Sequence, residues 1–410
     1  MRPHACSLLL VLAFLATSWA GEPVIVDHGS AVIPDIPPHW IERAKSNLHI
    51  AYGHTSHGSQ LTDGMTGLIT FTGGCGGPQF AWNNGGSEGA LDLHDYAMDG
   101  DCGYYPEWVD NTRAYLDDPA NSDCNVIIWA WCGQVSGYSE QDMIDRYLVP
   151  MSQLEADYPH VKFVYMTGHL NYWERENTNA RNQQIRDYCI ANAKILYDFA
   201  DIESYDPDGT YFPYATDSCD YWDAYGNYQG NWAVEWQSTH VQDVEWYDCP
   251  SAHSQPLNAN LKAYAAWWLW CRLAGWSGHH ELNADGWSIP ASTGGTISFA
   301  LEAGVAQAGR GYVLLGSVSG TEPGWALPGG LATLPLNWDA FTSLVLRLLN
   351  SPAFAGFFGT LDGWGLATAR FDTLGPVPPE FVGVRMYYAY FLLGWPMDFA
   401  SNAVEVDIVP

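Results

Sequence analysis

The chain has 410 residues, with 46 acidic against 16 basic side chains and a formal net charge of −30. Such an acidic balance repels nucleic acids and anionic membrane surfaces, so we expect neither as a partner. Beyond the N-terminal segment no stretch reaches the ~18 uninterrupted apolar residues that a membrane-spanning helix needs, and we expect a soluble mature protein.

The N-terminal segment, residues 1–20, has the pattern of a secretory signal peptide. Arg2 precedes an apolar run over residues 7–16, and residues 18–20 supply a small-x-small cleavage signal before Gly21. The apolar run is too short to cross a bilayer, which makes a retained N-terminal anchor the weaker alternative. The pattern therefore predicts export, to the extracellular space or the cell surface.

Cysteine usage agrees with export. Apart from Cys6, which precedes the apolar run, eight cysteines remain, and all lie before residue 280. An even number of cysteines in an exported protein predicts disulfide bonds. Cys75 with Cys102 would close one long insertion and Cys219 with Cys249 would brace another, although about 105 pairings are possible.

Short apolar runs alternate with helical patterns over residues 21–278. The runs are rich in β-branched and aromatic residues, as in strands buried on both faces of a parallel sheet, and occupy residues 48–52, 125–131, 161–166 and 194–199. Apolar residues at helical spacing occur at residues 140–158, 179–193 and 257–273. The alternation predicts right-handed βαβ crossovers and an α/β domain, a three-layer α/β/α parallel sheet.

The rest of the chain, residues 285–410, has a different amino-acid composition. It has few charges, many Gly and Pro residues, and short apolar runs separated by turn signals every 8–15 residues or so, which predicts a smaller all-β sandwich domain. One helical pattern, residues 338–349, interrupts it. Histidine is absent beyond His280, so we expect an accessory or surface-attachment domain without catalytic residues.

Polar segments that contain histidine or glycine follow three of the predicted strands. They occupy residues 53–60, 132–137 and 167–171, and a fourth, residues 248–255, precedes the last helix of the α/β domain. Ligands of parallel α/β sheets bind at the carboxyl ends of the strands. The sequence therefore predicts a functional site at this edge of the sheet.

These segments contain the residue types that a serine hydrolase needs. Such an enzyme requires a nucleophile on a tight turn, a base within hydrogen-bond reach, an orienting acid and donors for an oxyanion. Ser56 is the candidate nucleophile because Gly58 completes half of a nucleophile elbow, with Thr55 and Ser59 as competitors. His253, just before the last helix, is the candidate base.

The remaining roles fall to the other segments. Asp248 is the nearest carboxylate upstream of His253 and is the candidate orienting acid. The backbone N–H of Gly133 and the side chain of Asn171 are candidate oxyanion donors, and His169 is expected to converge on the same site.

The order of these segments resembles the SGNH/GDSL hydrolase superfamily over residues 46–276. There, a Gly-Asp-Ser motif follows the first strand, a Gly and a Gly-x-Asn follow later strands, and Asp-x-x-His precedes the last helix. This chain reads Gly-His-Thr-Ser at residues 53–56, places Asn171 one residue late after Gly168, and has Pro250 where that Asp would stand. The resemblance implies a flavodoxin-like α/β fold and cleavage of small-molecule or glycan esters without a cofactor.

A second resemblance covers the same part of the chain. The segments GHTSHGSQ, WCGQVSG, MTGH and AHSQPLN look like those of a group of uncharacterised exported bacterial proteins. The C-terminal part looks like a module at the ends of other exported bacterial proteins. Neither likeness implies an activity.

Besides an exported SGNH-like serine esterase or deacylase, two other classes of function remain open. A metal-dependent hydrolase could hold zinc with neutral imidazoles and one carboxylate, although no HExxH motif is present, and the candidate ligands are His54, His57, His169 and His253, with Asp95 or Asp248. A non-catalytic carbohydrate-binding or surface protein is the third class, because residues 211–246 form a long aromatic-rich insertion suited to a wall or lid over the strand ends.

Overall fold

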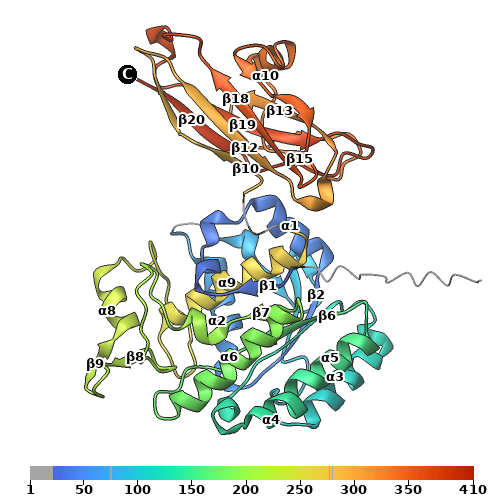
Figure 1. The fold of residues 1–410 in the computed structure, drawn as a ribbon, viewed down its shortest axis with the longest axis vertical. Coiled ribbons are helices and arrows are strands. Elements are labelled where there is room, and N and C mark those ends of the chain that lie inside the picture. The colour runs from blue at the N-terminus through green and yellow to red at the C-terminus, as the bar shows by residue number, and fades with distance from the viewer. Residues whose placement is uncertain (1–21, 74–75, 277, 279) are drawn as a thin grey trace, which may run out of the picture.

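The computed structural model describes residues 22–73, 76–276, 278 and 280–410. The predicted signal peptide, Cys6 and Cys75 lie outside these described residues. Within them the chain forms an α/β part followed by a β part (Figure 1). None of the described helices is long and apolar enough to cross a membrane.

A seven-stranded parallel sheet forms the centre of the α/β part. Its strands lie side by side in the order β1 (Val24–Val26), β7 (Ile195–Tyr197), β6 (Lys162–Met166), β5 (Val126–Trp129), β2 (His49–Gly53), β4 (Leu91–Asp95) and β3 (Trp82–Asn83). The four predicted strands are β2, β5, β6 and β7, and most of their side chains are buried, as their continuous apolar character requires. Taken in chain order, the five strands β4-β2-β5-β6-β7 have the 2-1-3-4-5 arrangement of flavodoxin-like folds.

Helices cover both faces of this sheet and complete the three predicted layers (Figure 1). One face carries α1 (Pro38–Asn47), α2 (Ser59–Thr70) and α9 (Pro256–Leu273), and the other carries α3 (Glu107–Asp117), α4 (Glu140–Met143), α5 (Val149–Asp157) and α6 (Arg175–Ala191). Helices α2 and α9 approach closely, because Gly64 has no side chain and a Cβ there would lie 2.1 Å from Ala259 O. Helix α9 is buried on nearly all sides and therefore carries apolar residues around most of its circumference.

The aromatic-rich insertion after β7 has secondary structure of its own. A short helix, α7 (Phe199–Ile202), leads into it, and it contains a hairpin of β8 (Asp220–Trp222) and β9 (Tyr228–Asn231) followed by α8 (Trp232–Thr239). The insertion is thus a folded subdomain beside the sheet (Figure 1).

The β part contains the predicted pair of sheets. One has the order β10 (Leu282–Ala284), β12 (Thr296–Glu302), β18 (Leu366–Asp372) and β16 (Phe354–Ala355); the other has β11 (Ser288–Pro290), β20 (Val404–Val409), β19 (Arg385–Leu392), β13 (Gly311–Ser317) and β17 (Phe358–Thr360). Phe299 and Phe371 of the first sheet pack against Tyr388 of the second, with ring centroids 4.9 and 5.7 Å apart. A small hairpin joins β14 (Trp325–Ala326) to β15 (Thr333–Leu334), and the predicted helix over residues 338–349 is α10 (Ala340–Arg347).

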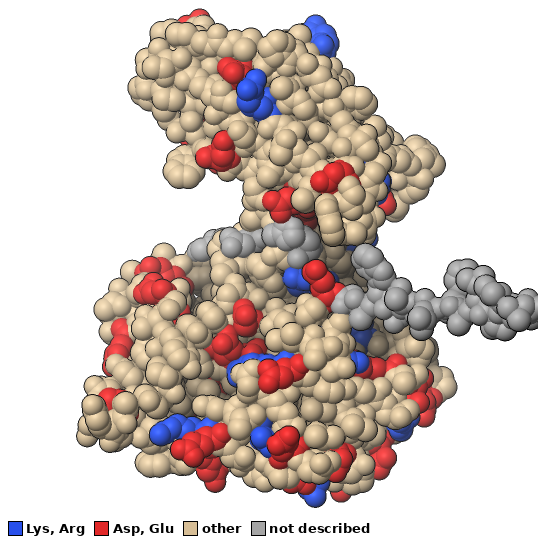
Figure 2. Space-filling model, viewed as in Figure 1, with Lys and Arg blue, Asp and Glu red and all other residues tan. Residues whose placement is uncertain are grey.

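The two parts meet at a buried polar contact. Trp40 of α1 donates its indole N–H to Glu281 Oε1 over 2.5 Å, and burial raises the pKa of this Glu281 carboxyl. Charge is unevenly distributed between the parts: Figure 2 shows acidic side chains spread over the visible face of the α/β part and few charged side chains on the β part.

The expected disulfides are not formed among the described residues. All seven described cysteines carry free thiols: Cys102, Cys124, Cys132, Cys189, Cys219, Cys249 and Cys271. The proposed pair is engaged elsewhere, because Cys219 Sγ lies 3.2 Å from Ser254 Oγ and Cys249 Sγ accepts a hydrogen bond from Asn260 Nδ2 at 3.4 Å. Most of these thiols are buried, so they pack as small apolar residues.

Candidate active site

The carboxyl ends of β2, β5 and β6 form one edge of the sheet, and the predicted site segments leave from there. In the sheet, strand β2 has β4 on one side, with β3 beyond it, and the later β5 on the other side. Such a reversal of strand order opens a crevice in which doubly wound proteins bind ligands. Ser56 follows β2 in the short 3-10 helix η3 (Ser56–Gly58), and Cys132 and Gly133 follow β5.

Ser56 and His253 are brought together, although 197 residues separate them. Ser56 Oγ lies within hydrogen-bonding distance of His253 Nε2. Both residues have left-handed backbone conformations, with φ of 27° and 63°, which residues other than glycine rarely adopt. Backbone strain of this kind concentrates at functional sites. The geometry is that of a nucleophile and its base.

The competing nucleophiles are engaged elsewhere. Thr55 Oγ1 donates to Asp101 Oδ2 at 2.8 Å, and the Ser59 hydroxyl is hydrogen-bonded to Asp63. Ser56 is therefore the hydroxyl of this segment that faces a histidine.

Two predicted site residues take other positions. Asp248 is exposed, and among the described residues no hydrogen bond or ion pair joins it to His253. Asn171 caps a turn, because its Oδ1 accepts the N–H groups of Trp173 and Glu174 at 3.0 and 3.1 Å. Its amide Nδ2 donates to the Glu174 carboxylate, so this side chain is not free to bind an oxyanion.

Gly133 keeps its predicted position at the site. It begins the 3-10 helix η7 (Gly133–Gly137), and the first N–H groups of a helix have no partner within it. A Cβ on Gly133 would lie 3.9 Å from His169 Nε2, so Gly133 lies beside the histidines. Its amide N–H is the candidate donor to a negatively charged oxygen bound there.

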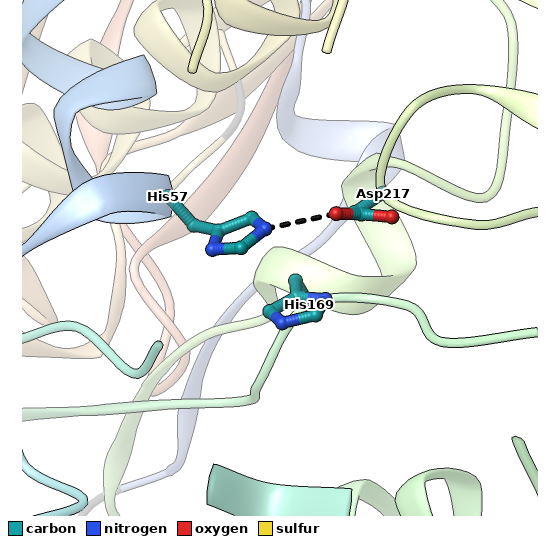
Figure 3. A group of neighbouring side chains, drawn as sticks. All are labelled: His57, His169 and Asp217. Atoms are coloured by element: carbon teal, nitrogen blue, oxygen red, sulfur yellow. Dashed lines mark hydrogen bonds and ion pairs between the residues drawn. The ribbon is translucent and has the colours of Figure 1, made fainter. Parts of the chain in front are cut away.

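His57 and Asp217 form a second polar pair in the site, and sequence reasoning did not find Asp217. His57 Nε2 donates to Asp217 Oδ2 at 2.9 Å (Figure 3). Burial would raise the pKa of Asp217, but hydrogen bonds from His57 and Thr216 lower it to about 2. Burial lowers the pKa of His57 although Asp217 opposes this. At neutral pH the pair is therefore a neutral imidazole beside a carboxylate.

Three imidazole rings stack in this site. The centroid of the His57 ring lies 3.8 Å from that of His169 and 4.4 Å from that of His253, with interplanar angles of 9° and 22°. Two rings at these distances must occupy opposite faces of His57. His169 Nδ1 lies 2.7 Å from the carbonyl of Leu170, which can only accept, so the proton of neutral His169 is on Nδ1 and its Nε2 is an acceptor.

The stack does not fit the zinc site that was the alternative interpretation of these histidines. Ligand atoms of His57, His169 and Asp217 do lie within 4.8 Å of one another. However, a tetrahedral ion needs imidazole lone pairs that converge on it, and rings inclined by 9° direct their lone pairs along parallel planes. His54 is turned away, because its Nε2 pairs with Asp95 at 2.7 Å and its ring packs on Tyr96. The four histidines therefore do not form one metal site in this arrangement.

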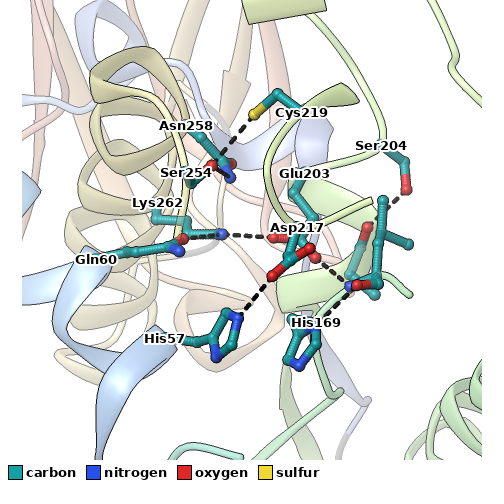
Figure 4. Close-up of polar contacts among 12 residues, drawn as sticks. His57, Gln60, His169, Glu203, Ser204, Asp217, Cys219, Ser254, Asn258 and Lys262 are labelled. Carbon is teal, nitrogen blue, oxygen red and sulfur yellow. Dashed lines mark hydrogen bonds and ion pairs between the residues drawn. The ribbon is translucent and has the colours of Figure 1, made fainter. Parts of the chain in front are cut away.

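A buried ion pair ties the site segments together (Figure 4). Lys262 Nζ of α9 donates to Glu203 Oε2 at 2.7 Å and to Gln60 Oε1 at 2.5 Å, and both charged side chains have no exposed surface. Gln60 Nε2 donates to the carbonyl of Ala252, next to His253, and Glu203 Oε1 accepts the N–H of Leu170, next to His169. Three of the site segments, residues 53–60, 167–171 and 248–255, thus converge on one buried charge pair.

Exposed aromatic rings lie beside the site. Trp173 is 82% exposed, and its ring centroid lies 6.1 Å from that of Trp222 in β8. Trp222 in turn stacks on Tyr172 at 4.1 Å. Tyr172 and Trp173 directly follow the site segment after β6 in the chain.

No protein-family model and no curated protein matches this chain.

Proposed function

We propose that the protein is an exported serine esterase or deacylase that cleaves acyl esters and is related to the SGNH hydrolases. The observation that carries the proposal is the contact between Ser56 Oγ and His253 Nε2 at the carboxyl edge of the sheet. The 2-1-3-4-5 strand arrangement and the order of Ser56, Gly133 and His253 along the chain support the relationship. Export is supported by the sequence of residues 1–20.

In the proposed reaction, His253 takes the hydroxyl proton of Ser56 as the serine oxygen bonds to the acyl carbon. The carbonyl oxygen becomes negative, and the amide N–H of Gly133 stabilises it. The ester C–O bond then breaks, and His253 gives its proton to the departing alcohol. Water repeats these steps on the acyl-serine and releases the acid. Among the described residues no carboxylate is hydrogen-bonded to His253, so the two residues act as a dyad.

The exposed aromatic rings that follow the site segment after β6 support a carbohydrate ester as the substrate. Trp173 presents most of its ring to solvent, and Trp222 lies beside it. Ligand sites commonly combine such flat apolar surfaces with a few polar groups.

Hydrolysis of a short acyl nitrophenyl ester and labelling by a fluorophosphonate test the proposal. Ser56→Ala should abolish labelling, and His253→Gln should lower kcat about 100-fold or more, the range of general-base catalysis. Ser59→Ala is the matched control, because Ser59 lies on the same segment and its hydroxyl is hydrogen-bonded to Asp63. Labelling that persists in Ser56→Ala would refute Ser56 as the nucleophile.

A non-catalytic glycan-binding protein is the second candidate, and the exposure of Trp173 favours it. It predicts glycan binding that is unchanged in the double variant Ser56→Ala/His253→Ala, with no ester turnover by the unaltered protein. Turnover that depends on Ser56 would exclude this candidate.

A further inference from the structure

Cys132 lies at the same edge of the sheet and takes no part in the reaction proposed above. It follows the central strand β5 and is partly exposed. Its neighbour Trp131 is buried and donates its indole N–H to the carbonyl of Met166 at 2.9 Å, which holds the segment to the end of β6. Cys132 Sγ lies 4.0 Å from His57 Nδ1. A thiol and an unassigned imidazole therefore face each other at the site.

The second nitrogen of this imidazole determines what the first can do. His57 Nε2 keeps its proton and donates a hydrogen bond to Asp217, so Nδ1 of the neutral ring carries a lone pair, and that lone pair faces the thiol. Asp217 is ionised and fixes this tautomer. Thiol, imidazole and carboxylate thus have the mutual arrangement of a nucleophile, its base and an orienting acid. A distance of 4.0 Å is long for catalysis, but such contacts are often looser before a substrate binds.

We propose that Cys132, His57 and Asp217 form a second nucleophilic set, in which Cys132 takes an acyl group as a thioester. His57 Nδ1 accepts the thiol proton while the sulfur bonds to the acyl carbon. The ester C–O bond of the substrate breaks, and the departing alkoxide takes the proton from His57. Water then hydrolyses the thioester, which regenerates the thiol and releases the acid. The acyl class of the substrate rests on the proposed function, whereas the reactivity of the thiol does not.

The other described thiols provide a background of low reactivity. Cys102, Cys124, Cys189, Cys219 and Cys271 are buried. Cys249 is the best internal control, because it is also partly exposed, but burial raises its pKa to about 12. Thiolate, not thiol, is the reactive species, so Cys249 should react slowly.

Alkylation by iodoacetamide, mapped by peptide mass spectrometry, tests the reactivity. The sulfur of Cys132 forms a bond to carbon as iodide leaves, and His57 receives the proton. At pH 7 we expect Cys132 to react at least about tenfold faster than Cys249, and His57→Gln to remove most of this difference, as loss of a general base would. Equal rates at the two cysteines, or a Cys132 rate unchanged by His57→Gln, would overturn the proposal. Peptide mapping keeps Cys6 and Cys75 out of the comparison.

Asp217 acts through His57 and needs a readout of its own. The His57 Nε2 proton, which is held by the carboxylate, should give a downfield proton NMR signal in the unaltered protein and in Asp217→Glu. The signal should be lost in Asp217→Asn, together with the fast alkylation of Cys132. If His57→Gln does not fold, this pair of variants gives the same test. Fast alkylation in Asp217→Asn would overturn the role of Asp217.

The acyl step is tested in the Ser56→Ala variant, which separates the two nucleophiles. Incubation with nitrophenyl acetate should place an acetyl group on the peptide that contains Cys132, and no such adduct should form when Cys132→Ala is added. Absence of the adduct in Ser56→Ala would overturn thioester formation. Conversely, Cys132→Ala alone should leave fluorophosphonate labelling of Ser56 unchanged, so that failure of the serine proposal and failure of the cysteine proposal give different results.

Discussion

Replacement of Lys262 by Met would break the buried ion pair beneath the site. The ammonium lies 2.7 Å from Glu203 Oε2, and neither side chain has any exposed surface. Removal of one partner leaves the other as an uncompensated buried charge, which costs about 3–5 kcal/mol. Gln60 also loses its donor, and an unsatisfied buried acceptor costs about 1–3 kcal/mol. We therefore expect Lys262→Met to lower the free energy of unfolding by about 4 kcal/mol or more.

Urea denaturation followed by circular dichroism measures this loss. The double variant Lys262→Met/Glu203→Gln is the matched control, because it removes both charges and keeps an oxygen that can accept the N–H of Leu170. It should recover most of the lost stability, since buried ion pairs can often be replaced as a pair at little cost. A loss below about 1 kcal/mol in Lys262→Met would refute the reasoning, because a loss of that size is typical of exposed ion pairs. No recovery of stability in the double variant would also refute it.

Three further changes test other parts of the site. The pKa of Asp217 lies at about 2 in the folded protein, below its value in the unfolded chain. Its carboxylate therefore contributes about 2 kcal/mol to the free energy of unfolding above about pH 4, and this contribution is lost as the pH falls towards 2. Denaturation curves measured at each pH should lack this acid-dependent loss of stability in Asp217→Asn. Gly58→Ala would place a Cβ 2.4 Å from His54 Cβ, so it should cost about 1–3 kcal/mol, displace Ser56 and lower kcat. Trp173→Ala should raise KM for glycan esters with little change in melting temperature, because the side chain is 82% exposed.

Matched controls exist for two of these changes. Gly137→Ala should be tolerated, since a Cβ there meets nothing within 4 Å. Trp287→Ala in the β part removes a similarly exposed indole, 80% accessible, and should leave KM unchanged. A stable, fully active Gly58→Ala protein would contradict the packing argument, and an equal KM effect at Trp287 would contradict the exposed aromatic rings after β6 as the glycan site.

The central strands could be predicted from the sequence because burial on both faces leaves continuous apolar runs. The remaining strands of the α/β sheet lack that signature. β4 alternates buried Leu91 and Leu93 with polar residues, and β1 and β3 are edge strands of three and two residues. The helix α10 was predictable inside a β domain because its apolar residues keep helical spacing.

The site was predictable where a residue follows a strand end and, for His253, where it precedes the last helix of the α/β part. Ser56, Gly133 and His169 lie at such positions, and topology brings them together. Asp217 comes from the folded insertion and lies 160 residues from His57, so no local spacing marks it. Asp248 was assigned as the orienting acid because it is close to His253 in the chain, but its side chain is exposed to solvent. Asn171 was assigned as an oxyanion donor from a motif, but it caps a turn. The cysteine count predicts disulfides, which stay a prediction; the seven described cysteines carry free thiols.

The stacked histidines would limit how the two proposed nucleophiles operate. A proton taken from Ser56 makes the His253 ring cationic, and the His57 ring lies only 4.4 Å away. Two unit charges at that separation repel by about 1–4 kcal/mol, depending on how well solvent screens them, which reduces double protonation up to several hundredfold. Protonation of His57 is therefore disfavoured while His253 holds its proton, and the reverse holds when Cys132 gives up its own. The serine and the cysteine would thus act in turn, because the adjacent His57 and His253 rings do not readily carry protons at the same time.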